Sequence, residues 1–186
     1  VFAFDVRPVV KEQVESLGAK FIEVQSDTDE GTGEGGYAKE VSEEYKKKQG
    51  LLIEETIKAM DIVISTALIP ERKAPILINE KMVKSMMPGS IIMDLAALNG
   101  GNCELTKCDH VITHSNIIID GRSNLPSTMA KDASQLYAKN VYNFLSHLYK
   151  EDDNKLNLED EITSGSMLLN NGKVCNEIVK QFLDKG

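Results

Sequence analysis

Short apolar segments alternate with amphipathic segments along the first 150 residues of the chain. The apolar segments are typical of buried strands and cover residues 1–4, 19–25, 61–67, 90–96, 110–114 and 116–121. The amphipathic segments repeat apolar residues every three or four positions and predict helices over residues 7–18, 37–60, 79–89 and 128–150. Because strands and helices alternate and the strands are continuously apolar, we expect an α/β fold. Its centre is a doubly wound, Rossmann-type parallel sheet covered on both faces.

Local signals set several boundaries of these elements. Gly18 is placed to end the first helix, Asn79 to cap the third, and Pro88 to stop it. Residues 162–174 predict a hairpin whose turn is the sequence Asn-Asn-Gly-Lys at 170–173. The long helix at 37–60 is expected to turn four residues inward (Val41, Tyr45, Leu52 and Ile57). The last long helix carries one apolar stripe (Met129, Ala133, Leu136, Val141, Phe144 and Leu148).

The sequence GTGEGG at residues 31–36 has the spacing G-x-G-x-x-G of a dinucleotide-binding loop. A functional loop of this kind follows a buried strand directly and opens a helix, so that backbone N–H groups face a pyrophosphate. Here the preceding apolar strand ends about six residues too early, and residues 23–36 carry five acidic residues and no basic one. That field repels phosphate, so we interpret the match as a flexible surface loop.

Composition excludes several classes of protein. The formal net charge of −8 argues against non-specific binding to nucleic acid or to an anionic membrane. No apolar run approaches the roughly 18 residues that span a bilayer, so we expect no direct membrane insertion of this segment. The three cysteines form no disulfide framework, which fits a reducing compartment. The chain begins at Val1 inside an apolar stretch, and we expect it to be a piece of a longer chain.

Asp5 ends the first apolar segment and has two interpretations. In a dinucleotide-binding sheet, the second strand ends in a carboxylate that binds the ribose hydroxyls, which would place the first strand and its glycine loop upstream of Val1. Alternatively, Asp5 caps the helix that follows. The residues alone leave both interpretations open.

Metal and nucleophile chemistry have weaker support. Cys103, Cys108, His110 and His114 have the spacing C-x4-C-x-H-x3-H, which matches no common structural zinc site, so we expect ordinary polar residues and no metal. A nucleophilic Cys103 lacks an identifiable partner base.

Several long blocks resemble the NAD(H)-binding domain of proton-translocating NAD(P) transhydrogenases. They are FDVRPVVKEQVESLGAKFIEV, GGYAKEVSEEYKKKQ, DIVISTALIPERKAPILINEKMVKSM, PGSIIMDLAALNGGNCELT, LPSTMAKDASQLYAKNVYNFL and LEDEITSG, and the resemblance runs to about residue 175. The sister family is alanine dehydrogenase. The resemblance implies a nucleotide-binding subdomain over residues 1–126. Residues 127–186 would form a helix and hairpin that return to the other subdomain, although residues 176–186 match no block.

The resemblance also implies an activity and an assembly. Hydride would pass directly between NAD(H) on this domain and NADP(H) on a separate domain, coupled to proton translocation by a membrane domain. The expected partners are those two domains and a second copy, in a homodimer. The expected location is the soluble face of an energy-transducing membrane, either the bacterial cytoplasmic membrane or an organellar inner membrane.

The residues that contact the cofactor are implied by the same resemblance. Asp5 would bind the adenosine ribose, and Tyr37 would close on the nucleotide from a mobile flap that contains GTGEGG. The segments after the fourth and fifth strands would line the nicotinamide, in agreement with the rule that ligands bind beyond the carboxyl ends of parallel strands. No catalytic side chain is expected, and the implied cofactor-binding set is Asp5, Val6, Arg7, Tyr37, Thr66, Ala67, Leu68, Asp94, Leu95, Ala96, Asn99 and Gly100.

Two departures keep alternatives open. The N-terminal subdomain, the glycine loop and the first strand of the family are missing from this sequence, so we expect residues 1–186 alone to bind NADH poorly. A non-catalytic, truncated Rossmann fragment is therefore one alternative. An alanine dehydrogenase-like oxidoreductase is the other, but that family carries an aspartate at the position of Leu98, and leucine has no acid–base chemistry.

Overall fold

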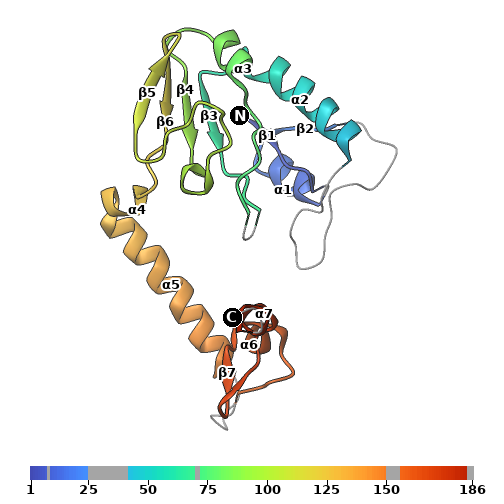
Figure 1. Ribbon diagram of the computed structural model, residues 1–186, viewed down its shortest axis with the longest axis vertical. Coiled ribbons are helices and arrows are strands. Elements are labelled where there is room, and N and C mark those ends of the chain that lie inside the picture. Colours follow the sequence, from blue (N-terminus) through green and yellow to red (C-terminus); the bar gives the residue numbers. More distant parts are fainter. Residues whose placement is uncertain (8, 25–41, 70–71, 150–155, 184–186) are drawn as a thin grey trace. The chain divides into compact units, whose positions relative to one another are not determined.

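The computed structural model describes residues 1–7, 9–24, 42–69, 72–149 and 156–183, which form two compact units, Val1–Asn124 and Leu125–Gly186 (Figure 1). The strands of the first unit are β1 (Phe2–Phe4), β2 (Lys20–Ile22), β3 (Ile62–Ser65), β4 (Ile91–Asp94), β5 (Val111–His114) and β6 (Ile117–Asp120). Its helices are α1 (Val10–Ser16), α2 (Glu43–Ile57), α3 (Glu80–Ser85) and a 3₁₀ turn, η2 (Ala97–Asn99).

The strands of the first unit form two sheets. β1 and β2 pair in parallel, and the second sheet has the order β3-β4-β6-β5. β3, β4 and β6 are parallel, so the predicted doubly wound α/β class is confirmed. β5 runs antiparallel to β6, because only the two-residue turn Ser115–Asn116 joins them and a parallel pair needs a long crossover. Both turn residues have positive φ, at 51° and 62°, as such tight hairpins require.

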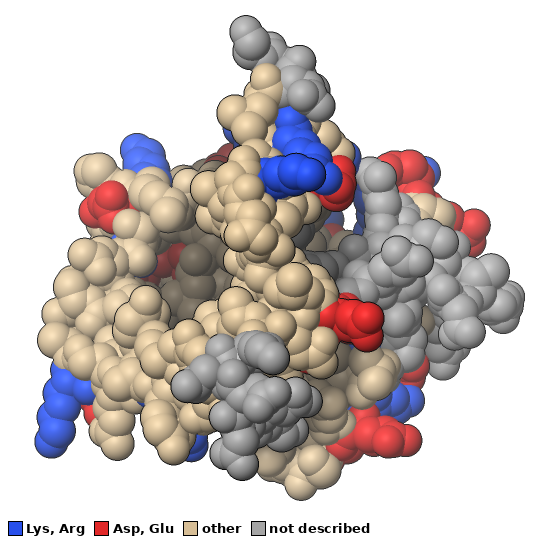
Figure 2. All heavy atoms as spheres, turned by 90° about the horizontal axis from the view of Figure 1, so that it is seen from below, with Lys and Arg blue, Asp and Glu red and all other residues tan. Residues whose placement is uncertain are grey.

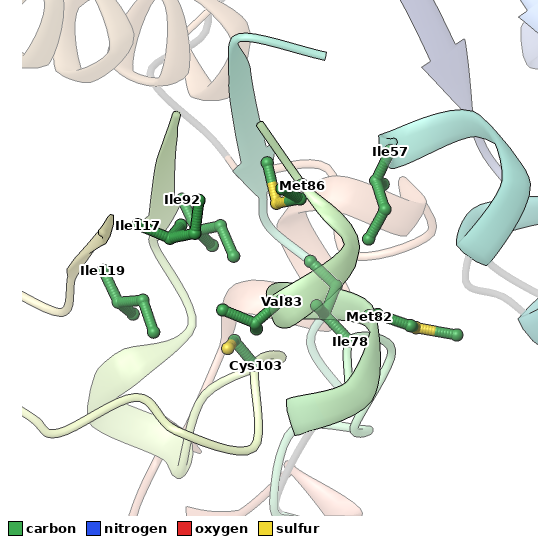
Figure 3. Close-up of a cluster of buried hydrophobic side chains, with 9 residues drawn as sticks. All are labelled: Ile57, Ile78, Met82, Val83, Met86, Ile92, Cys103, Ile117 and Ile119. Atoms are coloured by element: carbon green, nitrogen blue, oxygen red, sulfur yellow. The ribbon is translucent and has the colours of Figure 1, made fainter. Parts of the chain in front are cut away.

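One face of the larger sheet carries the hydrophobic core. Figure 3 shows its nine buried side chains, which come from α2, α3, β4, β6 and the intervening loops. Val83 of α3 and Ile92, Ile117 and Ile119 of the strands are completely buried. α3 covers this face because Asn79 starts it as predicted, with the Asn79 side chain accepting a hydrogen bond from Met82 N at 2.9 Å.

α2 follows its predicted pattern only in part. It begins at Ser42, whose hydroxyl accepts a hydrogen bond from Tyr45 N at 3.2 Å, and Tyr45 and Ile57 are buried as predicted. Gln49, one helical turn from Tyr45, is buried as well, which the apolar pattern did not indicate. The predicted start of this helix at residues 37–41 lies outside the described residues.

The opposite face of β3 departs from the prediction of a sheet covered on both sides. Ile62 and Ile64 point to that face and are 61% and 62% exposed. β3 pairs with β4 along one edge, and within the described ranges no strand pairs with its other edge. The continuous apolar pattern of β3 is therefore that of a central strand, although the strand lies at an edge here.

A close backbone approach fixes the end of β6. A Cβ atom built on Gly121 would lie 2.4 Å from the carbonyl oxygen of Lys107. Gly121 N also donates to His110 O at 3.0 Å, and Asp109 N donates to Gly121 O at 2.9 Å. Only glycine allows these two backbone segments to lie this close together.

The second unit contains the helices α4 (Leu125–Thr128), α5 (Ala130–Leu148), α6 (Glu161–Ser166) and α7 (Glu177–Leu183), and the strands β7 (Leu169–Asn170) and β8 (Lys173–Val174). The predicted turn is confirmed, with Asn171 and Gly172 at positive φ between β7 and β8. The prediction of strand over residues 162–166 is wrong. Asp160 caps α6 there by accepting hydrogen bonds from Thr163 N at 2.7 Å and Thr163 Oγ1 at 2.9 Å.

The Asp160 cap also anchors the end of α5. His147 Nε2 lies 2.8 Å from Asp160 Oδ2. The hydrogen bond to His147, followed by those from Thr163, lowers the pKa of Asp160 to about 2. The stabilising effect of this carboxylate is therefore present above its unfolded pKa and is lost as the pH falls through the folded value.

The predicted apolar stripe of α5 is helical but not buried in the second unit. Leu136 is 66% exposed, and none of the side chains of α5 is fully buried. Among the described helices, none has the length and the apolar character needed to cross a bilayer.

We expect Gly121→Ala to lower the free energy of unfolding by at least about 1–3 kcal/mol, because the new methyl group collides with the Lys107 carbonyl. The control is Gly50→Ala in α2, where an added Cβ meets nothing within 4 Å and alanine favours the helix by roughly 0.5–1 kcal/mol. The thermal midpoint of the complete protein should fall for the first variant and hold or rise for the second. Equal midpoints would contradict the close approach.

Candidate functional site

The candidate site lies at the carboxyl ends of β3 and β4. The two strands end in register, with Ser65 opposite Asp94, so the loops that follow them begin side by side. Leu95 N donates to Ser65 O at 2.9 Å, and Ala74 N donates to Asn99 O at 2.8 Å. The structure therefore brings together two of the three segments that were predicted to bind a nucleotide.

Asp94 organises the loop after β4 from inside. Its carboxylate is completely buried and accepts hydrogen bonds from four donors: Ala96 N at 3.1 Å, Asn102 N at 2.7 Å, Cys103 N at 2.9 Å and Thr106 Oγ1 at 2.6 Å. Backbone N–H donors suit a carboxylate, since each one offsets part of the cost of burying its charge. A direct contact of Asp94 with a nucleotide remains a prediction, because every contact described for it belongs to the loop.

The glycines of this loop have specific conformational roles. Gly100 and Gly101 have φ values of 103° and 83°, a backbone region that side chains disfavour. A Cβ on Gly101 would also lie 2.7 Å from Asp94 Oδ2 and 2.9 Å from the Thr106 side chain. The loop can therefore fold around the carboxylate only if residue 101 is glycine.

The other predicted residues of the two loops differ in exposure. Ala96 is buried and Ala67 is half-buried, so their side chains offer little surface to a ligand. The remaining predicted residues of the two loops are exposed, namely Thr66, Leu68, Leu95, Asn99 and Gly100. Leu98, on η2, is 74% exposed and adds to this mainly apolar surface.

Two buried polar side chains sit at this strand edge. The hydroxyl of Ser65 is buried and has no hydrogen-bond partner among the described residues. Asn102, which sequence reasoning did not single out, is completely buried, and its amide bonds to Ala67 and Pro75. An asparagine after two glycines is an ordinary loop sequence, so no signal in the sequence marks its burial.

Asp5 lies at the end of β1, in the smaller sheet, and is paired with Arg7. Asp5 Oδ1 accepts from Arg7 N at 2.8 Å and from Arg7 Nε at 2.9 Å, and Oδ2 accepts from Nη2 at 2.8 Å. Burial acts to raise the pKa of Asp5, but the hydrogen bonds and charge of Arg7 outweigh it and leave the pKa below its ordinary value. A carboxylate has about four acceptor positions, so one remains on Oδ2 for a further hydroxyl.

The same arrangement recurs at the end of β6, where it was not predicted. Arg122 N and Nε donate to Asp120 Oδ1, each at 3.0 Å, and the guanidinium also bonds to Oδ2. These bonds from Arg122 lower the pKa of Asp120. The shared pattern of an apolar strand followed by Asp-x-Arg, in FDVR and IDGR, is the sequence signal that could have identified both pairs.

The cysteine and histidine residues do not converge. Cys103 is buried in the core, and burial raises the pKa of its thiol, which disfavours a nucleophilic thiolate. His110 Nδ1 lies 2.8 Å from Cys108 O, while His114 lies beside Glu80 at 3.3 Å. Tyr37 and the GTGEGG loop lie outside the described residues, so the flap remains a prediction.

Charged side chains are scattered in the view of Figure 2. Lysine, arginine, aspartate and glutamate are intermixed there, and the described residues on that face form no broad basic patch. This distribution fits the argument from net charge against a nucleic-acid surface.

Comparisons with known proteins identify the family. Residues 1–177 match the model of the family "Alanine dehydrogenase/PNT, C-terminal domain", and the chain belongs to this family. The chain is 45% identical over 183 residues to an NAD(P) transhydrogenase alpha subunit of Rickettsia prowazekii, covering 97% of this chain and 46% of that protein. The predicted resemblance is confirmed.

A solved structure and a more distant relative agree with this assignment. The crystal structure of transhydrogenase from Sinorhizobium meliloti matches with a TM-score of 0.67 and 42% identity, over 94% of this chain and 45% of that one. An alanine dehydrogenase of Methanococcus maripaludis is 30% identical over 139 residues, covering 71% of this chain and 37% of that protein. The chain spans about half the length of the transhydrogenase alpha subunits of Rickettsia prowazekii and Rhodospirillum rubrum that it matches.

We expect Asp94→Asn to lower the free energy of unfolding by about 2–3 kcal/mol, because an amide nitrogen replaces an oxygen that faces N–H or O–H donors. Asp61→Asn, at the exposed amino end of β3, makes the same chemical change and should have little effect. The comparison is made by thermal unfolding of the complete protein. Similar losses in the two variants would show that Asp94 does not organise the loop.

Proposed function

We propose that this chain is the NAD(H)-binding part of a proton-translocating NAD(P) transhydrogenase. A nicotinamide bound at this site supplies a hydride donor or acceptor, and the partner nicotinamide is NADP(H) on a separate domain. The chain's own residues bind and orient the ring and exclude water. The proposal is supported by 45% identity to a transhydrogenase alpha subunit across nearly the whole chain.

The observation that carries the proposal is the chemistry of the loop after β4. Its strand-end acid, Asp94, is buried and committed to four loop donors, and next to it η2 presents the exposed apolar side chain of Leu98. Hydride transfer between two nicotinamides needs proximity and orientation, not a proton relay. An apolar surface without a free acid suits that reaction better than amine oxidation.

The residues present fit a dinucleotide. Asp5 Oδ2 retains an acceptor position for a ribose hydroxyl, and the buried hydroxyl of Ser65 lacks a partner among the described residues at the end of β3. The free edge of β3 and the exposed Ile62 and Ile64 suit a further strand between β1 and β3. We propose that this strand, and the backbone loop that binds the pyrophosphate, are supplied by sequence outside residues 1–186.

The assembly is proposed on the same basis. The chain would act as a homodimer with the NADP(H)-binding domain and the membrane domain of the transhydrogenase. It would lie on the soluble face of an energy-transducing membrane. Residues 125–186 would connect the nucleotide-binding subdomain to the rest of the protein.

We expect Asp5→Ala in the complete protein to weaken NADH binding by about 10- to 150-fold, the effect of losing a charge-assisted hydrogen bond to ribose. The same change releases Arg7, whose guanidinium can then attract a 2′-phosphate, so NADPH binding should tighten. Calorimetric titration with each nucleotide measures both effects, and Asp61→Ala is the control. Equal affinity of the unmodified protein for NADH and NADPH would contradict the role of Asp5.

A second test separates the two related activities. The complete protein should transfer hydride from NADH to an NADP analogue and should not oxidise L-alanine with NAD. Leu98→Asp should slow the transfer, because it places a hydrated charge beside the ring, without creating alanine oxidation. Leu51→Asp introduces the same charge at a position in α2 that is 69% exposed and serves as the control. Turnover of alanine by the unmodified protein would overturn the proposed activity.

A further inference from the structure

Asn102 connects the loop after β3 to the loop after β4 through its side chain. Asn102 Oδ1 accepts a hydrogen bond from Ala67 N at 2.9 Å, and Nδ2 donates to Ala67 O at 2.8 Å. The second Nδ2 hydrogen bonds to Pro75 O, also at 2.8 Å. The amide therefore uses both of its donors, and it pairs with both backbone groups of a residue 35 positions away.

The backbone of Asn102 is held just as firmly. Its N–H donates to Asp94 Oδ2 at 2.7 Å, and its carbonyl accepts from Leu77 N at 2.8 Å and Ile78 N at 3.0 Å. Asn102 thus joins the end of β4, the segment that precedes α3 and the loop after β3. Because the residue is completely buried, none of these bonds exchanges with bulk water without opening the loop.

The loop after β3 depends on this one contact. Among the described residues, the two bonds from Asn102 to Ala67 are the hydrogen bonds that tie the backbone of residues 66–69 to another segment. Thr66 and Leu68, on either side of Ala67, are exposed. Their position therefore follows from the position of the Asn102 amide.

We infer that Asn102 is a positioning residue that makes the two strand-end loops move as one body and thereby orients the surface that faces the nicotinamide. This inference rests on the proposed nucleotide site. Only an amide of this length provides a donor and an acceptor to Ala67 together with a second donor to Pro75. Aspartate would place a second carboxylate against two carbonyl oxygens, and alanine would leave three backbone groups unpaired.

The first measurement uses the unmodified complete protein without nucleotide. If the loops move together, the amides of residues 67–69 and 95–100 open with the same free energy and the same dependence on denaturant in native-state hydrogen exchange. Unrelated opening of the two loops would overturn the inference. This measurement needs no variant, so it holds even if substitution of a buried residue prevents folding.

The second measurement compares variants of the complete protein. Asn102→Asp should speed exchange at residues 67–69 and weaken NADH binding by at least about tenfold at pH 8. Burial and the two facing carbonyls raise the pKa of the new carboxyl group, so lowering the pH toward about 5.5 restores a donor and part of the affinity. Asn140→Asp, at an exposed position of α5, should change neither exchange nor affinity nor their pH dependence.

Asn102→Ala separates the loss of the bonds from the effect of a buried charge. It should weaken NADH binding at every pH and show no recovery on acidification. If the unmodified protein binds NADH and folded variants at position 102 bind it equally well, the positioning role is wrong. If the unmodified protein fails to bind NADH while exchange at 67–69 still rises in the variants, the proposed function fails and the mechanical link between the loops stands.

Discussion

The first unit depends on a single buried negative charge at the end of β4. Asp94 lies on the core-facing side of the sheet, where an uncompensated carboxylate would be very costly, and the chain offsets that cost by folding the next twelve residues around it. The positive φ values of Gly100 and Gly101, the burial of Asn102 and the position of η2 all follow from that requirement. The strand-end loop is in this sense a solvation shell made of protein.

The order of elements was predictable because it depends on hydrophobic periodicity and on local caps. Apolar runs and Asn79 gave the strands and the start of α3, and Asn171–Gly172 gave the second hairpin. The errors have physical causes. Residues 162–166 have strand-like composition, but a capping aspartate at 160 starts a helix there. β5 runs antiparallel because its connection to β6 is too short for a crossover.

The candidate site was predictable only in outline. That ligands gather at the carboxyl ends of parallel strands is a rule of topology, so the segments after β3 and β4 could be named from sequence. The partners of Asp94, the burial of Asn102 and the guanidinium on Asp5 depend on contacts between residues far apart in the chain or on the direction of a side chain. Periodicity carries no information about either, and the resemblance supplied roles for residues without their contacts.

The Asp5–Arg7 and Asp120–Arg122 pairs also affect how quickly an anionic molecule can reach the protein. The chain has a formal net charge of −8, and its long-range field opposes the approach of a polyanion. Each strand-end aspartate is neutralised by an arginine only two residues away, well within a Debye length of roughly 8 Å at physiological ionic strength. The encounter rate of a dinucleotide therefore varies less with salt than the net charge alone implies, because its final approach is to neutral pairs rather than bare carboxylates.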